Sequence, residues 1–209
     1  MKLFHRVLPA LVLAAAATAC STGVRAPQHY HVLDPAPAPA PVAAAAQAST
    51  LLVTPTTAAG FYDAQAIVYS PTVGTRAYYQ LNSWTEPPSR RLGALLTERL
   101  RRSGAFGTVA DATGGVHGML VLDTHLDEIY HDAAARPGLA KVSLTAVLSD
   151  PARRFVAGQR RFTASAPALT SDAAGAVQAF DVALGPLLDE VVAWAGQTAA
   201  RSRGPDASP

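Results

Sequence analysis

Three ionisable side chains alternate along one stretch of the sequence that reads as a β-strand. Asp123, His125 and Asp127 stand two residues apart, and successive side chains on a strand point to opposite faces, so all three would share one face. Carboxylate and imidazole groups are metal ligands, and such a row could hold a divalent cation. Charged residues are also what the solvated face of a half-buried strand normally carries. We favour this second interpretation and predict no metal site.

Motifs that position a nucleophile or a phosphate group are absent from the sequence. It has no Gly-x-Ser-x-Gly elbow, no P-loop and no Gly-x-Gly-x-x-Gly fingerprint. The glycine-rich stretch Gly114–Gly118 leads into a predicted strand rather than a helix, which indicates a turn and not a phosphate cradle. The net charge is only +2 and there are two lysines, so the composition does not indicate a nucleic-acid-binding protein. We therefore predict a chain that is not an enzyme and needs no cofactor.

The single cysteine follows an apolar run near the N-terminus. Lys2 and Arg6 precede residues 7–19, which are apolar or small, and Cys20 comes directly after them. This run is too short to span a bilayer, for which about 20 residues are needed, and it has the anatomy of a secretory signal peptide. One cysteine also excludes an internal disulfide. An ordinary signal peptide that leaves an incidental free thiol is one interpretation of Cys20.

The more specific interpretation rests on the residues just before the cysteine. Residues 17–20, Ala-Thr-Ala-Cys, resemble a bacterial lipoprotein signal, with Ala17 where such signals most often have Leu. The resemblance implies that residues 1–19 are removed and that Cys20 carries a diacylglycerol and an N-acyl chain such as palmitate, which anchor a protein firmly. Ser21 at the next position implies the outer membrane, with the protein facing the periplasm. Loss of Lys2 and Arg6 leaves 15 basic side chains against 15 acidic ones.

A change of composition divides the rest of the chain. Proline and alanine alternate over Pro35–Pro41, and alanines follow to residue 48. Such a sequence favours polyproline II and forms a semi-rigid spacer. We predict a lipidated N-terminus and tether at residues 20–48, one folded domain at 49–199 and a disordered tail at 200–209.

Hydrophobic periodicity predicts the elements of this domain. Leucines at helical spacing follow Pro87-Pro88 and end at Ser103-Gly104. A second helix runs from about residue 172 to 198, and Gly185-Pro186 should kink or split it. Strands are predicted at 51–54, 65–70, 77–81, 116–130, 142–148 and 155–164, the last with a bulge at Gly158. The order β-β-β-α-β-β-β-α predicts an α+β fold in which two main helices pack on one face of a mostly antiparallel sheet.

Two blocks of sequence carry a family resemblance. The segment Tyr30–Asp34 follows the cysteine closely, and the block Tyr79–Pro88 reads Tyr-Gln-Leu-Asn-Ser-Trp-Thr-Glu-Pro-Pro at the start of a leucine-rich helix. With these blocks the chain resembles the ABC-type transport auxiliary lipoproteins, the family that contains the small outer-membrane lipoprotein of the paraquat-inducible operon. The likeness covers most of residues 28–198.

The resemblance implies a non-catalytic periplasmic subunit of a lipid transport system. Its expected partner is an MCE-domain protein and, through it, an inner-membrane ABC permease and ATPase. Tyr and Trp are enriched in interface hot spots, so we predict Tyr78, Tyr79 and Trp84 as the docking surface, although a core role for them stays open. A periplasmic carrier that holds a lipid or another small ligand in a groove between helices and sheet is the alternative function. Self-association of the chain also stays open.

Overall fold

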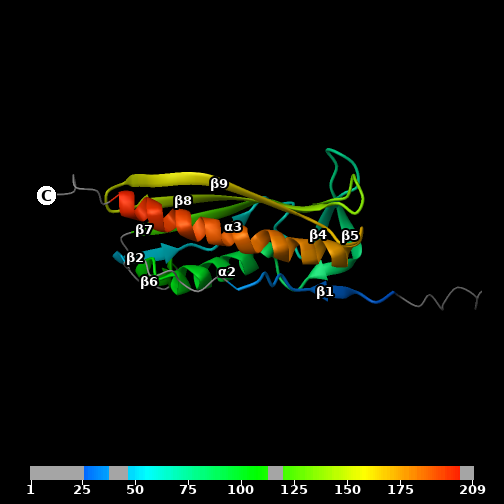
Figure 1. The fold of residues 1–209 in the computed structure, drawn as a ribbon, viewed down its shortest axis with the longest axis horizontal. Helices are drawn as coiled ribbons and strands as arrows, with labels where there is room; N and C mark the ends of the chain where they lie inside the picture. The colour runs from blue at the N-terminus through cyan, green and yellow to red at the C-terminus, as the bar shows by residue number, and fades with distance from the viewer. Residues whose placement is uncertain (1–25, 38–46, 113–119, 203–209) are drawn as a thin grey trace, which may run out of the picture.

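The computed structural model describes residues 26–37, 47–112 and 120–202. Eleven helices and strands follow one another along these residues (Figure 1): β1 (His29–His31), β2 (Gln47–Val53), β3 (Thr57–Ala58), β4 (Ala66–Ser70), β5 (Ala77–Trp84), α2 (Pro88–Ser103), β6 (Phe106–Asp111), β7 (Leu120–Asp132), β8 (Leu139–Asp150), β9 (Phe155–Pro167) and α3 (Ala173–Arg201). The predicted α+β class and the two main helices are confirmed. Strands β1, β3 and β6 were not predicted.

Strand β7 is the centre of the sheet. Along one edge it pairs antiparallel with β8, which in turn pairs antiparallel with β9. Along the other edge β2, β3 and β4 pair with it one after another, all parallel. Outside them lie β6, which pairs with β2, and β5, which pairs with β4 and carries β1. The sheet is therefore mixed: its longest ladders are antiparallel as predicted, and the three strands paired with the other edge of β7 are parallel to it.

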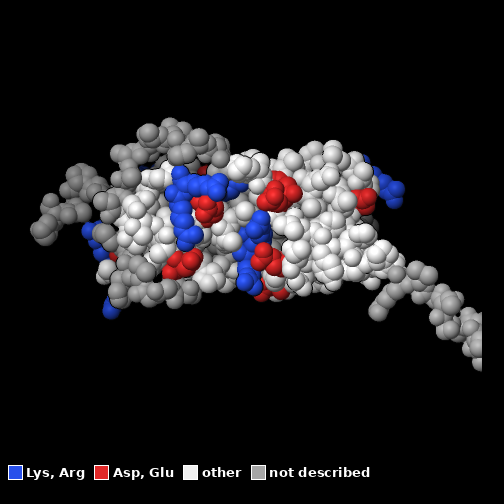
Figure 2. Space-filling model, turned by 90° about the horizontal axis from the view of Figure 1, so that it is seen from below, with Lys and Arg blue, Asp and Glu red and all other residues white. Residues whose placement is uncertain are grey.

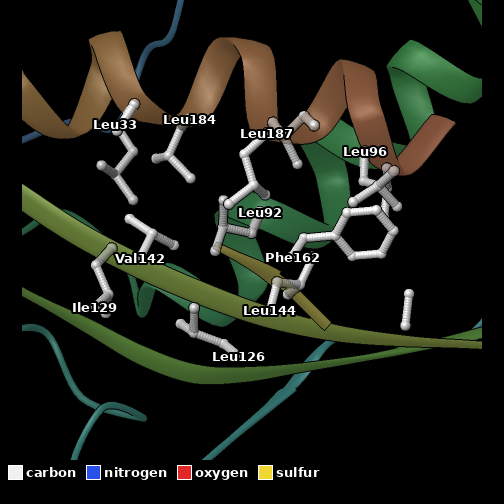
Figure 3. Packing of buried hydrophobic residues seen from close by; sticks show 14 of the residues in the cluster. Leu33, Leu92, Leu96, Leu126, Ile129, Val142, Leu144, Phe162, Leu184 and Leu187 are labelled. Carbon is white, nitrogen blue, oxygen red and sulfur yellow. The ribbon is translucent and has the colours of Figure 1, made fainter. Parts of the chain in front are cut away.

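The helices and the sheet enclose one hydrophobic core. In Figure 3, side chains of α2 and α3 point toward side chains of β7, β8 and β9, and the residues labelled there include Leu92, Leu96, Leu184, Leu187, Leu126, Leu144 and Phe162. All of these side chains are almost completely buried. The labelled side chains thus pack against one another between the helices and the sheet.

Local signals set the ends of α2 as the sequence predicts. Pro88 occupies the first turn, where a missing N–H costs nothing. Gly104 ends the helix with φ of 65°, in the left-handed region that glycine adopts without strain. Arg101 and Arg102 lie in the last turn, where a positive charge is favourable.

Helix α3 continues through Pro186, so the predicted split is wrong. Asp172 caps its N-terminus by accepting a hydrogen bond of 2.9 Å from the backbone N–H of Gly175. Pro186 cannot donate to the carbonyl group of Val182, but both residues lie on the exposed side of the helix, where water can satisfy that carbonyl. Leu184 and Leu187 on either side of the proline are buried, and their packing holds the two halves in one helix.

The N-terminal segment from β1 to residue 36 packs on the rest of the chain. Leu33 is 3% exposed and belongs to the hydrophobic core. Arg91 of α2 donates to the carbonyl oxygen of Leu33 at 2.8 Å, and the buried Arg99 donates to the carbonyl oxygen of Ala36 and pairs with Asp189 of α3. The Pro-Ala run therefore begins within the first packed segment, and only residues 21–28 separate Cys20 from β1. The tether that we propose is correspondingly shorter than residues 20–48.

Several predictions fall on residues outside the described ranges. These are the signal peptide, Cys20, the Gly114–Gly118 turn and most of the C-terminal tail. Among the described residues, none of the helices combines the length and the apolar character that crossing a membrane requires.

Candidate functional site

Two aromatic rings lie stacked at the surface beside β5. Phe61, in the loop after β3, and Tyr78 of β5 have ring centroids 4.6 Å apart and an interplanar angle of 13°. The hydroxyl group of Tyr78 also donates to the carbonyl oxygen of Phe61 at 3.3 Å. The two residues are 41% and 37% exposed. Large, rigid aromatic surfaces of this kind are what protein partners bind most strongly.

Arg76 supports the aromatic pair through Tyr62. Its Nε donates to the hydroxyl oxygen of Tyr62 at 3.0 Å, and its Nη2 lies 3.3 Å from Oε1 of Glu128. Its guanidinium carbon lies 3.6 Å from the ring centroid of Tyr130, a cation–π contact. The ring of Tyr62 meets that of Phe61 edge-on at 5.8 Å. We call Phe61, Tyr62, Arg76, Tyr78 and Tyr130 the aromatic cluster.

The neighbouring Tyr79 is engaged in a buried hydrogen-bond chain. Its hydroxyl oxygen lies 2.8 Å from Nδ1 of His131, and Nε2 of His131 lies 3.0 Å from the carbonyl oxygen of Pro137. His131 is fully buried. In the neutral imidazole Nε2 must donate to the carbonyl group, so Nδ1 accepts from the hydroxyl of Tyr79. Burial, together with the nearby Asp172 and Tyr69, raises the pKa of Tyr79 to about 12.

Trp84 lies in the core and not on the docking surface. It is 2% exposed, and its ring meets that of Phe180 on α3 at a centroid distance of 5.7 Å. This burial is not compatible with the partner contact predicted for it, because its ring has no free surface. The structure thus separates the three predicted residues. Tyr78 is at the surface, Tyr79 is half-buried, and Trp84 stabilises the fold.

Phe61, Arg76 and Tyr130 of the aromatic cluster were missed by the sequence analysis. They come from the loop after β3, the last position before β5 and the end of β7, and no regular spacing in the sequence relates them. The signal that was present is the density of Tyr residues between 62 and 79. It marks a region rich in aromatic residues but cannot show which of them share a surface.

The alternating residues Asp123, His125 and Asp127 on β7 each form a hydrogen bond with a side chain of a neighbouring segment. Asp123 accepts from Oγ1 of Thr54 at 2.8 Å. Nδ1 of His125 lies 2.8 Å from Oγ1 of Thr57. Asp127 accepts from Thr145 at 2.8 Å. No group of three His, Cys, Asp or Glu among the described residues is placed to hold a metal ion.

A groove of about 420 Å³ runs between α2 and the ends of β2 and β6, together with residues 54–56 after β2. Small residues of both sides line it, including Thr56, Gly93 and Ala94, and charged residues lie along its rim. Gly93 permits the close approach of the helix, because a Cβ atom there would lie 2.9 Å from Oγ1 of Thr56. Groove and rim could contact an elongated ligand that is partly apolar.

The charges around α2 neutralise one another. Figure 2 shows Lys and Arg next to Asp and Glu over one face of the molecule. The ion pairs of the helix include Arg90 with Glu86 at 3.5 Å, Arg102 with Glu98 at 2.6 Å and Arg101 with Asp111 at 3.6 Å. Because each of these arginines has an acidic neighbour, the helix does not present a net positive surface for an anionic partner.

Comparison with known proteins identifies a family whose model matches this chain. The family model described as "ABC-type transport auxiliary lipoprotein component" matches residues 30–192. The crystal structure of a DUF330 protein from Xanthomonas campestris is 25% identical, has a TM-score of 0.76 and covers 83% of this chain and 97% of its own. An uncharacterized protein of known structure is 14% identical with a TM-score of 0.56, and the match covers 85% of this chain and 97% of that protein, which shows a shared fold. No curated protein matches.

Proposed function

Because the chain belongs to the family of ABC-type transport auxiliary lipoprotein components, we propose that it is the non-catalytic docking subunit of an MCE-type lipid transport system. Its lipidated Cys20 holds it in the outer membrane, and its domain faces the periplasm. The aromatic cluster binds an MCE-domain protein and links the chain through it to an inner-membrane ABC permease and ATPase. The observation that carries the docking role is the exposed, stacked pair of Phe61 and Tyr78.

The construction of the aromatic cluster supports a binding role. The stacked pair is restrained by the hydrogen bond from Tyr78 to Phe61 and by the contact of Phe61 with Tyr62, which Arg76 holds. Little side-chain entropy is therefore lost when a partner covers the pair. The described residues include no metal-binding group, and the sequence has no nucleophile motif. A preorganised aromatic surface without reactive groups suits a docking protein.

Affinity purification of the full lipidated chain in mild detergent tests the proposal. We expect an MCE-domain protein to be recovered with the wild type and to be lost or strongly reduced with Tyr78→Ala. Tyr30→Ala is the matched control, because Tyr30 is an exposed tyrosine on another strand. Failure to recover an MCE-domain protein with the wild type would contradict the proposed partner. An equal loss with both variants would contradict the proposed surface.

Anchoring through Cys20 needs a separate experiment. We expect mass spectrometry of the mature chain to show a diacylglycerol and an N-acyl chain on Cys20 as the new N-terminal residue. Cys20→Ser should abolish this mass increase and release the protein from the membrane fraction. Density separation of the two membranes then tests the outer-membrane location, and recovery of the wild type with the inner membrane would contradict it.

The groove beside α2 favours a second candidate function, that of a lipid carrier. The groove lies between α2 and residues of the sheet, which is the kind of place that this alternative requires. Native mass spectrometry of the purified chain should then show a bound lipid. Ala94→Trp, which places a large ring in the groove, should remove the lipid and leave partner recovery intact. A chain that purifies without lipid would contradict this second function.

A further inference from the structure

Three turns meet at one end of the molecule. The backbone N–H of Ala133 donates to the carbonyl oxygen of Ser70 at 3.0 Å, and that of Ala168 donates to the carbonyl oxygen of Gly138 at 3.0 Å. These bonds join the turn between β4 and β5, the turn between β7 and β8, and the connection from β9 to α3 (Figure 1). We call residues 71–76, 133–138 and 168–172 the loop end.

The loop end presents apolar side chains to solvent. Val73, in the turn between β4 and β5, is 89% exposed, and Leu169, in the connection to α3, is 77% exposed. Leu139, directly after the turn between β7 and β8, is 40% exposed. Aliphatic side chains that protrude from neighbouring turns are suited to the boundary between lipid head groups and acyl chains.

The charges of the loop end fit an anionic lipid surface. Arg136 is exposed and forms no salt bridge with any described residue. The acidic groups at this end are already engaged. Asp132 pairs with Lys141 at 2.7 Å, and Asp172 caps α3. The cation that is left for an external partner is therefore Arg136, and phosphate groups of phospholipids are suitable partners for a guanidinium group.

The N-terminal segment brings the anchor to the same end. Figure 1 shows the chain entering β1 from the side on which β4 and β5 lie. Strand β1 is held by its pairing with β5, and Leu33, two residues after the strand, is buried in the core. Cys20 precedes the first described residue, Ala26, by six positions, and six residues span at most about 20 Å. A lipid on Cys20 therefore lies within about 20 Å of the first described residue, at the end of the molecule from which the chain enters β1.

We propose that the loop end rests on the membrane that holds the anchor. Val73 and Leu169 enter the interfacial region, and Arg136 contacts phosphate head groups. This inference rests on the proposed lipidation of Cys20. A second copy of the chain could also cover the apolar side chains, but the short connection to Cys20 brings this end to the membrane in each single molecule.

Single thiols placed at chosen positions test the orientation. Cys20 is the only cysteine, and acylation consumes its thiol, so Val73→Cys and Leu169→Cys each add the one free thiol of the mature chain. Ala152→Cys is the control, because the turn between β8 and β9 lies at the opposite end in Figure 1. Each full-length variant is labelled with a nitrobenzoxadiazole probe and reconstituted into vesicles of phosphatidylethanolamine and phosphatidylglycerol. We expect a blue shift and quenching by bromoacyl lipids at positions 73 and 169 but not at 152.

Each outcome of this experiment decides a separate point. Failure of the wild type to float with the vesicles would refute the anchoring, and with it the premise of the inference. Flotation with equal probe responses at 73, 169 and 152 would overturn the orientation alone. A blue shift at 73 and 169 that depends on protein concentration and resists bromoacyl lipids would show that a second copy covers the loop end, which also overturns the inference. Arg136→Glu should reduce the quenching at 73, whereas Arg154→Glu at the opposite end should not.

Discussion

Substitution of Trp84 by alanine should strongly destabilise this domain. Trp84 stands in the same sequence block as Tyr79. Its side chain is 2% exposed and packs on Phe180 of α3. Aromatic side chains bury about 150–250 Å² each, and at about 25 cal/mol per Å² this burial corresponds to about 4–6 kcal/mol. Measured Trp→Ala changes in cores cost about 3–5 kcal/mol. We therefore expect Trp84→Ala to lower the free energy of unfolding by about 3–5 kcal/mol.

Tyr78→Ala provides the comparison, because Tyr78 lies on the same strand but is 37% exposed. Its loss removes an aromatic pair worth about 0.5–1.5 kcal/mol beyond the area that the ring buries. Urea unfolding of both full-length variants measures the difference, and Trp194, the second tryptophan of the chain, remains as the fluorescence reporter. If Trp84→Ala were no less stable than Tyr78→Ala, the assignment of Trp84 to the core would be refuted.

Three further substitutions have expected outcomes. Gly138→Ala should lower the free energy of unfolding by about 3 kcal/mol. The reason is that φ at Gly138 is +101° and that a Cβ atom there would lie 2.3 Å from Nε2 of His131. An unchanged melting temperature would contradict this. Asp172→Ala should cost about 1 kcal/mol at neutral pH. Hydrogen bonds from the first turn of α3 and from a neighbouring hydroxyl hold the pKa of Asp172 below its ordinary value, so its contribution is present above that ordinary value and is lost as the pH falls through the lowered pKa; urea unfolding across the acid range should show the variant and the wild type converging. Leu33→Ala should release the segment around β1 and speed its amide hydrogen exchange, whereas Val32→Ala, at a 49% exposed neighbour, should leave exchange unchanged.

The elements that local signals specify were predictable from the sequence. A proline at the start and a glycine at the end delimit α2, and both residues act through their own backbone conformations. Strands β8 and β9 are joined by a short turn at residues 151–154, so neighbours in sequence are also neighbours in the sheet. The bulge predicted at Gly158 is confirmed by the register shift opposite Leu148 and Ser149. Each of these features depends on residues close together in the chain.

The features that long-range pairing decides were not predictable. Strands β2, β3 and β4 all lie along one edge of β7, about 70 residues later in the chain, and no local pattern encodes that parallel pairing. The different exposure of Tyr78 and Trp84 was not predictable either. Their even spacing on β5 would place both on one face by simple alternation. The pairing of β4 with β5 instead shifts register between Ala66 and Val68, and the alternation of buried and exposed residues is interrupted along β5. Trp84 is covered by Phe180 of α3, almost 100 residues away, while Tyr78 stays exposed.

The turn between β4 and β5 connects the proposed partner surface to the proposed membrane surface. Val73 is in this turn, Arg76 ends it, and Tyr78 follows two residues later on β5. Because Arg76 also bonds to Tyr62 and Glu128, the position of the aromatic cluster is fixed relative to the loop end. A partner bound to Tyr78 would then approach close to the membrane that holds the anchor, as a docking subunit for transport between membranes requires. The two surfaces can still be separated by experiment. Changes at Val73 should alter membrane contact and leave partner recovery intact, and Tyr78→Ala should do the reverse.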